Sequence, residues 1–115
     1  MNAHIPEIDC DGWWEQGWLG RQAMSPLRLQ FFDGSVRGSG ADMIGTFTLQ
    51  GELTTDGEVT LRKRYLRKHE VAYWGRYDGE GCLHGEWSVG GMRGPWMITL
   101  RRVAGHESMD IRALD

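Results

Sequence analysis

Lys63 is the residue whose type and position suggest chemistry most directly. It falls between Leu61 and Tyr65 in the run Glu58–Leu66, on the side of the run that is otherwise apolar. Burying an ammonium there is costly unless it is paired, because desolvation disfavours the charged form. We therefore expect Lys63 to anchor an anion, or to act as an amine of lowered pKa, inside a ligand cavity. The alternatives are a lysine at the rim that reaches water, or a bulge that turns it outward.

Aromatic side chains on the neighbouring runs could complete such a cavity. Tyr65 shares the run of Lys63, Tyr73 lies on the next run and Trp87 on the one after that. Asp42 could also form an acid–base pair with His69 or Lys63, although the sequence does not fix the distance between them. The predicted ligand-binding residues are Lys63, Tyr65, His69, Tyr73 and Trp87.

The densest basic stretch of the chain lies around the same position. Beside the aromatic rings of Tyr65 and Trp74 it could form a nucleic-acid surface. Alternation, however, sends neighbouring side chains to opposite faces, and the whole chain carries 16 acidic against 13 basic residues, a net charge of -3. We therefore predict a solvated edge and no nucleic-acid partner. The five bases are Arg62, Lys63, Arg64, Arg67 and Lys68.

Other chemical motifs are missing from the sequence. His, Cys and acidic residues show no metal-ligand spacing, and no nucleophile elbow or phosphate loop occurs. We therefore predict no metal and no cofactor, and we favour binding over catalysis, with acid–base chemistry as an open alternative. The acidic start of the chain and the lack of an apolar run of about 18 residues predict a cytoplasmic protein with no membrane partner.

The elements that must position these residues are strands. Short alternating runs, with no helical periodicity, are separated by Asp-Gly and Gly-Gly pairs that are typical of tight hairpin turns. Consecutive antiparallel strands without a covering helix favour a closed barrel, so we predict an all-β, eight-stranded antiparallel up-and-down β-barrel. The predicted strands are Trp13–Leu19, Leu27–Phe32, Ser35–Ser39, Thr46–Leu53, Glu58–Leu66, Glu70–Tyr77, Cys82–Ser88 and Trp96–Arg102.

The 115 residues suffice for one domain. We predict an acidic leader at residues 1–11, the barrel at 12–103 and a polar tail at 104–115, with the ends poorly ordered.

Trp74 and Ala72 lie on the outward-facing side of the predicted strand Glu70–Tyr77. They could form the centre of a homodimer interface, where Trp is enriched.

The two ends of the barrel region carry a family resemblance. Gly12-Trp13-Trp14 opens the first run as G-x-W, and Arg101-Arg102 ends the last, a combination that resembles the calycin superfamily of lipocalins, fatty-acid-binding proteins and avidins. The resemblance implies that Trp14 plugs one barrel end under Arg101 or Arg102. Gln16 stands where avidin-like barrels have Asn, so their biotin contacts are not carried over.

Resemblance and residues together predict a protein that holds a partly apolar, anionic small molecule in the barrel interior. The alternative is a structural or adaptor barrel with a packed interior, which binds a protein through its outer wall or basic corner.

Overall fold

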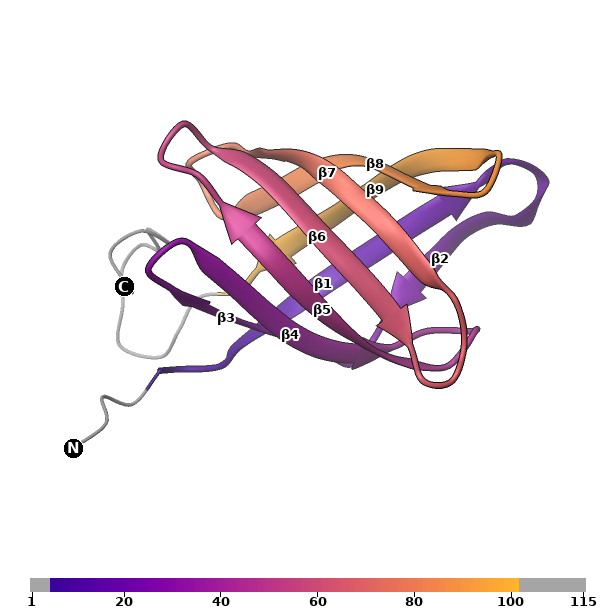
Figure 1. The fold of residues 1–115 in the computed structure, drawn as a ribbon, viewed down its shortest axis with the longest axis horizontal. Coiled ribbons are helices and arrows are strands. Elements are labelled where there is room, and N and C mark those ends of the chain that lie inside the picture. Colours follow the sequence, from indigo (N-terminus) through magenta and orange to yellow (C-terminus); the bar gives the residue numbers. More distant parts are fainter. Residues whose placement is uncertain (1–4, 102–115) are drawn as a thin grey trace.

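The computed structural model describes residues 5–101, which form nine strands and one short 3-10 helix (Figure 1). No helix among these residues is long and apolar enough to cross a membrane. In chain order the elements are β1 (Ile8–Gln16), η1 (Gly17–Leu19), β2 (Gly20–Met24), β3 (Leu27–Phe32), β4 (Ser35–Ala41), β5 (Thr46–Leu53), β6 (Glu58–Tyr65), β7 (Glu70–Tyr77), β8 (Cys82–Val89) and β9 (Met92–Leu100).

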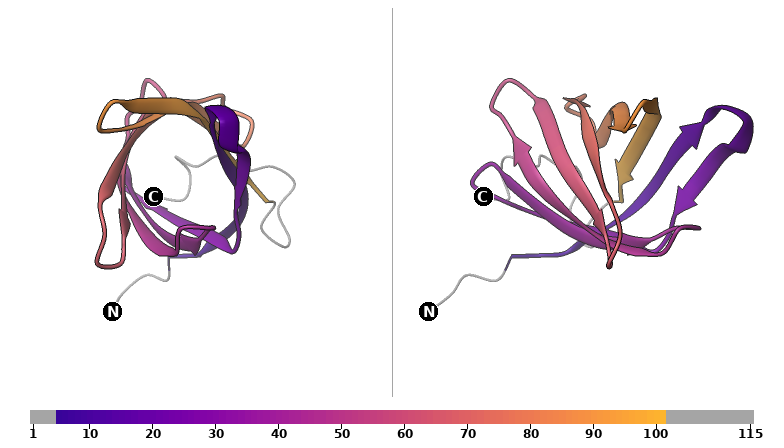
Figure 2. Two further views of the ribbon diagram at one scale, coloured as in Figure 1. Left: turned by 90° about the vertical axis from the view of Figure 1, so that its right-hand side faces the viewer. Right: turned by 45° about the vertical axis from the view of Figure 1, so that its right-hand side comes forward.

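The strands form one closed antiparallel sheet, which confirms the predicted barrel. From β3 to β9 each strand pairs with the next, and β9 returns to β1 between Cys10↔Leu100 and Trp14↔Trp96. β2 and β3 pair with successive parts of β1, at Gly12–Gln16 and at Ile8 and Asp9. Together they fill one position in a ring of eight, which the end-on view in Figure 2 shows as a closed circle.

The first boundaries differ from the predicted ones. β1 begins at Ile8, inside the predicted leader at residues 1–11, because Ile8 and Cys10 alternate inward and are buried. The predicted strand Trp13–Leu19 is wrong at its end, since the chain turns at Gly17 and Gly20, both with positive φ. The following strand β2 was not predicted. The predicted tail at 104–115 lies outside the described residues.

The core follows the predicted alternation. Side chains of one parity on β5 to β9 are buried, including Leu49, Leu61 and Trp96, while those of the other parity are mostly exposed. Glycines on the inward parity permit close approach between strands. A Cβ on Gly51 would overlap the carbonyl oxygen of Thr60, and one on Gly75 would overlap that of His84. These glycines therefore let neighbouring backbones come closer than a side chain allows.

Candidate functional site

Lys63 lies inside the barrel, with 1% of its surface exposed. Its Nζ forms an ion pair with Asp42 Oδ2 at 2.7 Å and donates a hydrogen bond to Tyr73 Oη at 3.1 Å. Met24 Sδ lies 3.5 Å from the same nitrogen. Because β6 is regular from Glu58 to Tyr65, neither a rim position nor an outward bulge describes this lysine.

Asp42 is the acceptor on which the interior polar groups converge. It lies in the turn between β4 and β5, and its side chain is fully buried. Besides Lys63, Oδ2 accepts hydrogen bonds from Tyr65 Oη at 2.7 Å and Trp14 Nε1 at 3.0 Å. Oδ1 accepts one from the backbone N–H of Ile44 at 2.9 Å, which fixes the turn. Of the two pairings expected for Asp42, the structure therefore has the one with Lys63, and both side chains of this pair are buried inside the barrel.

Aromatic rings surround the ammonium on several sides. Its Nζ lies 4.3 Å from the ring centre of Phe47, 4.9 Å from Tyr65, 5.3 Å from Tyr73 and 5.6 Å from Trp14. All four distances are within the range of cation–π attraction. Within residues 5–101 no buried side-chain nitrogen or oxygen lacks a hydrogen-bond partner. This part of the interior is therefore packed and electrostatically satisfied.

Burial shifts the titration of the interior groups. Desolvation lowers the pKa of Lys63 to about 8, although Asp42 favours the ammonium. Burial opposes ionisation of Asp42, but the hydrogen bonds from Lys63 and Tyr65 and the charge of Lys63 hold its pKa below the usual range. Burial, reinforced by Asp42, raises the pKa of Tyr65 and Tyr73 well above their ordinary values. Both tyrosines are therefore neutral hydroxyls at neutral pH.

A cavity of about 150 Å³ lies above this cluster, at the barrel end where β1 finishes. Four of the five predicted ligand-binding residues line it, and Lys63 lies beneath, bonded to Tyr73 and to Asp42. The interior is thus packed around Lys63 and hollow at this end, which we call the mouth. The lining residues are Trp14, Gln16, Ile44, Tyr65, His69, Val71, Tyr73, Trp87, Val89 and Met92.

The rim of the mouth carries its few available polar groups. The imidazole of His69 is exposed and lies 5.3 Å from the ring of Tyr65, centre to centre. Gln16 Nε2 approaches Met92 Sδ at 3.1 Å. By contrast, the indole N–H of Trp87 is engaged by the carbonyl oxygen of Glu15. A molecule in the mouth would therefore meet apolar walls and, at the rim, one imidazole and one amide.

Of the predicted plug, the structure has Trp14 at a barrel end but not Arg101 over it. Trp14 is buried at the mouth, where its ring makes an edge contact with Trp87 at 6.0 Å. The structure does not bring Arg101 to it, because Arg101 follows the far end of β9 and its guanidinium pairs with Asp11. The lid over Trp14 is therefore absent from the described residues, and Arg102 lies outside them.

The basic stretch does not form one patch. Lys63 points inward, Arg64 pairs with Glu70 at 3.1 Å, and Lys68 Nζ bonds the carbonyl oxygen of Ile44. Arg62 is exposed on the outer wall of β6. The two predicted interface residues, Trp74 and Ala72, lie on the outer wall of β7 and are exposed, as their parity predicted.

Some contributors were not predicted from the sequence. Met24 belongs to the unpredicted strand β2, and Phe47, in the predicted strand Thr46–Leu53, was not named as a neighbour of Lys63. The rim residues Gln16 and Met92 lie at strand ends, where alternation gives no orientation. Asp42, by contrast, was named from the sequence as a possible partner of Lys63 or His69, and only the distance was left open.

The structure is the only source of information on the Lys63 cluster and the mouth. Among residues 5–101 no group of three or more His, Cys, Asp or Glu side chains could hold a metal ion. A scan against protein-family models, a search of the curated proteins and a search of the solved structures each return no match for this chain.

Proposed function

We propose that the protein binds a small, mostly apolar molecule in the mouth of the barrel. The observation that carries this proposal is the cavity of about 150 Å³, whose lining is predominantly aromatic and aliphatic. It lies next to the Lys63 cluster, in which every buried polar side-chain atom already has a hydrogen-bond partner. An apolar cavity of about that volume takes a molecule the size of benzene. Binding of small molecules within the barrel is also what the calycin resemblance implies.

The polar end of the ligand is inferred from the rim. Lys63 already has a carboxylate partner at 2.7 Å, so an incoming anion would meet no uncompensated ammonium. The groups left for recognition are the imidazole of His69 and the amide of Gln16. We therefore propose an uncharged ligand with one hydrogen-bonding group directed to the rim, in place of the anion expected from the sequence.

Nuclear magnetic resonance of the indole N–H groups tests this proposal, because Trp14 and Trp87 line the mouth, whereas Trp18 is 89% exposed and does not line it. Titration with benzyl alcohol should shift the signals of Trp14 and Trp87 and leave that of Trp18 unchanged. Toluene tests the apolar part of the ligand alone. Benzoate tests the anionic alternative, which predicts tighter binding than benzyl alcohol and loss of that preference in Lys63→Met.

A filled mouth provides the matched control. Val89→Phe adds a ring to the cavity wall and should abolish the shifts, whereas Thr48→Phe adds the same ring to the outer wall of β5 and should not. If benzyl alcohol and toluene leave the Trp14 and Trp87 signals unmoved, or if Val89→Phe still binds them, the mouth is not the binding site.

A further inference from the structure

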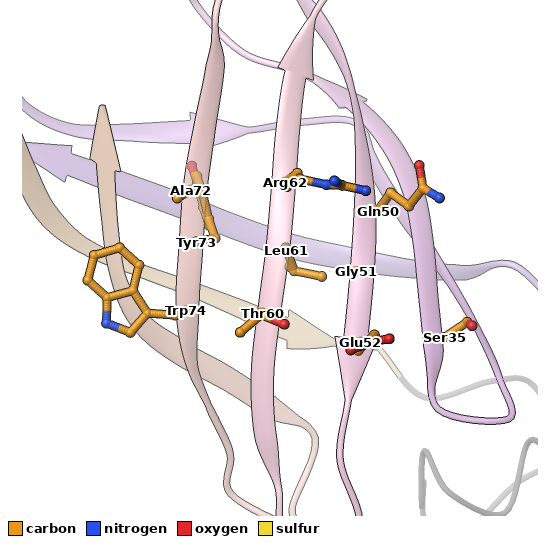
Figure 3. Close-up of a pocket in the computed structure, with 10 residues that line it drawn as sticks. All are labelled: Ser35, Gln50, Gly51, Glu52, Thr60, Leu61, Arg62, Ala72, Tyr73 and Trp74. Carbon is orange, nitrogen blue, oxygen red and sulfur yellow. The ribbon is translucent and has the colours of Figure 1, made fainter. Parts of the chain in front are cut away.

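A second hollow lies on the outer wall across β4 to β7, and of its lining residues only Tyr73 also lines the mouth. It has a volume of about 570 Å³, and small-molecule sites commonly occupy roughly 300–1,000 Å³. Figure 3 shows how it arises: Arg62 extends from β6 across β5 toward Gln50, whereas the ring of Trp74 leans from β7 in the opposite direction. The small side chains of Thr60 and Ala72 lie between them. We call this hollow the outer groove.

Three polar side chains of the outer groove have no partner among the residues that the structure describes. The side chains of Arg62, Gln50 and Glu52 make no hydrogen bond or ion pair within the range 5–101. Other charges on the outer wall are paired, for example Arg64 with Glu70 at 3.1 Å. The groove therefore presents donors and acceptors that only solvent or a ligand can satisfy.

The kinds of hydrogen-bonding groups define the ligand. Arg62 offers donors only, Glu52 acceptors only, and the amide of Gln50 offers both. Hydroxyls of Ser35 and Thr60 add two further groups of both kinds. One guanidinium and one carboxylate balance in charge, so the matching ligand is neutral. It must also carry many groups that donate and accept at once, as hydroxyls do.

The aromatic wall adds an apolar requirement. Trp74 is 38% exposed and flanks the groove, and an exposed indole offers a flat apolar face with a polar edge. Sugar rings combine a face of C–H groups with equatorial hydroxyls at the edge, and they meet both requirements. We propose that the outer groove binds a neutral oligosaccharide, with a sugar ring against Trp74 and hydroxyls bonded to Arg62, Gln50 and Glu52.

Two other occupants fit the same groups less well. A nucleic acid strand would bring phosphates close to the carboxylate of Glu52, on a protein of net charge -3. A second copy of the chain would bury Arg62 and Glu52 in the centre of its interface, where charged residues are depleted. An oligosaccharide instead replaces water on each group by a hydroxyl.

The test uses the full chain and five defined probes: the hexaoses of β-1,4-glucose, β-1,3-glucose, β-1,4-xylose, β-1,4-mannose and β-1,4-N-acetylglucosamine. At least one should bind, measured by calorimetry and by the shift of the Trp74 indole signal. Arg62→Ala and Trp74→Ala should weaken that binding at least tenfold. The matched controls are Arg37→Ala, on the outer wall of β4 but not lining the groove, and Trp18→Ala, and both should bind like the wild type.

Several results would overturn the proposal. One is that none of the hexaoses binds the wild-type chain. Another is that Arg62→Ala, an exposed substitution that leaves the core intact, binds as tightly as Arg37→Ala. Binding of single-stranded oligodeoxythymidylate that requires Arg62, or a dimer in sedimentation that Trp74→Ala dissociates, would instead assign the groove to those partners. Because the mouth is a separate cavity, none of these results bears on its ligand.

Discussion

The buried pair of Lys63 and Asp42 leads to a prediction that a double-mutant cycle can test. The single changes are Lys63→Met, which keeps the length of the side chain and removes the charge, and Asp42→Asn, which keeps the shape and removes the charge. The double change removes both charges together. If the two residues act as a pair, the cost of the double change should be well below the sum of the single costs.

The magnitudes follow from the partners that each change leaves behind. Asp42→Asn leaves a buried ammonium with neutral neighbours only, Tyr73 Oη at 3.1 Å and Met24 Sδ at 3.5 Å. Breaking a buried pair in this way should cost about 3–5 kcal/mol of unfolding free energy. Lys63→Met leaves the carboxylate with the donors of Trp14, Tyr65 and Ile44, so we expect a smaller cost of about 1–3 kcal/mol.

The assay is equilibrium unfolding in urea at pH 7, with the slope of each transition compared to confirm that all four proteins unfold in the same manner. We expect a coupling free energy of about 2 kcal/mol between the two positions. Additivity within about 0.5 kcal/mol would refute the reasoning. So would a Lys63→Met protein more stable than the wild type, which is the result expected of an unpaired buried lysine.

Three further predictions concern pH, the start of the chain and a glycine. The pKa of Lys63 in the folded protein, about 8, lies below its ordinary value of 10.5, so the unfolded chain binds more protons between these values. Relative to Lys63→Met, the wild type should therefore gain about 1 kcal/mol of stability between pH 8 and pH 9 in urea unfolding, and a loss would contradict the sign. Deleting residues 1–7 should change the melting temperature little. Deleting residues 1–11 removes buried side chains of β1 and should lower the free energy of unfolding by more than about 2 kcal/mol. Equal melting temperatures for the two deletions would mean that residues 8–11 do not stabilise the barrel. Gly51→Ala should lower the free energy of unfolding by more than about 1 kcal/mol, because its Cβ would meet the backbone of β6. Gly91→Ala, in open space, should leave it nearly unchanged. Similar losses in urea unfolding of the two variants would contradict the close approach of β5 and β6 at Gly51.

Much of the barrel was predictable because its information is local. Alternation over eight residues, as in Glu58–Tyr65, tells which side chains share a face, and Asp-Gly pairs tell where the chain reverses. The same alternation predicted the inward position of Lys63 and its closeness to Tyr73. The strand boundaries could not be predicted where the alternation is interrupted, as at Gly17 and Gly20. A turn of so few residues looks in the sequence like the continuation of the same strand.

The partner of Lys63 was harder to predict because it depends on ring closure. Asp42 lies in a turn, and no periodicity tells whether a turn side chain points into the barrel or into solvent. Its contacts with Lys63 and Trp14 span 21 and 28 residues of sequence and form only once β1, β4 and β6 are in place. Arg101, one of the two residues expected to cover Trp14, does not reach it for a related reason, since it leaves β9 at the opposite end of the barrel.

The neighbours of Lys63 on β6 bear on how the chain selects a single alignment. Arg62 and Arg64 flank it and face outward. If β6 slid by one residue against β5 and β7, Lys63 would turn to solvent and both arginines would enter the core. Asp42 alone could not neutralise two guanidiniums, so the misaligned barrel would bury an unpaired charge. The misaligned state of β6 is therefore strongly disfavoured, and the two arginines select the alignment in which Lys63 meets Asp42.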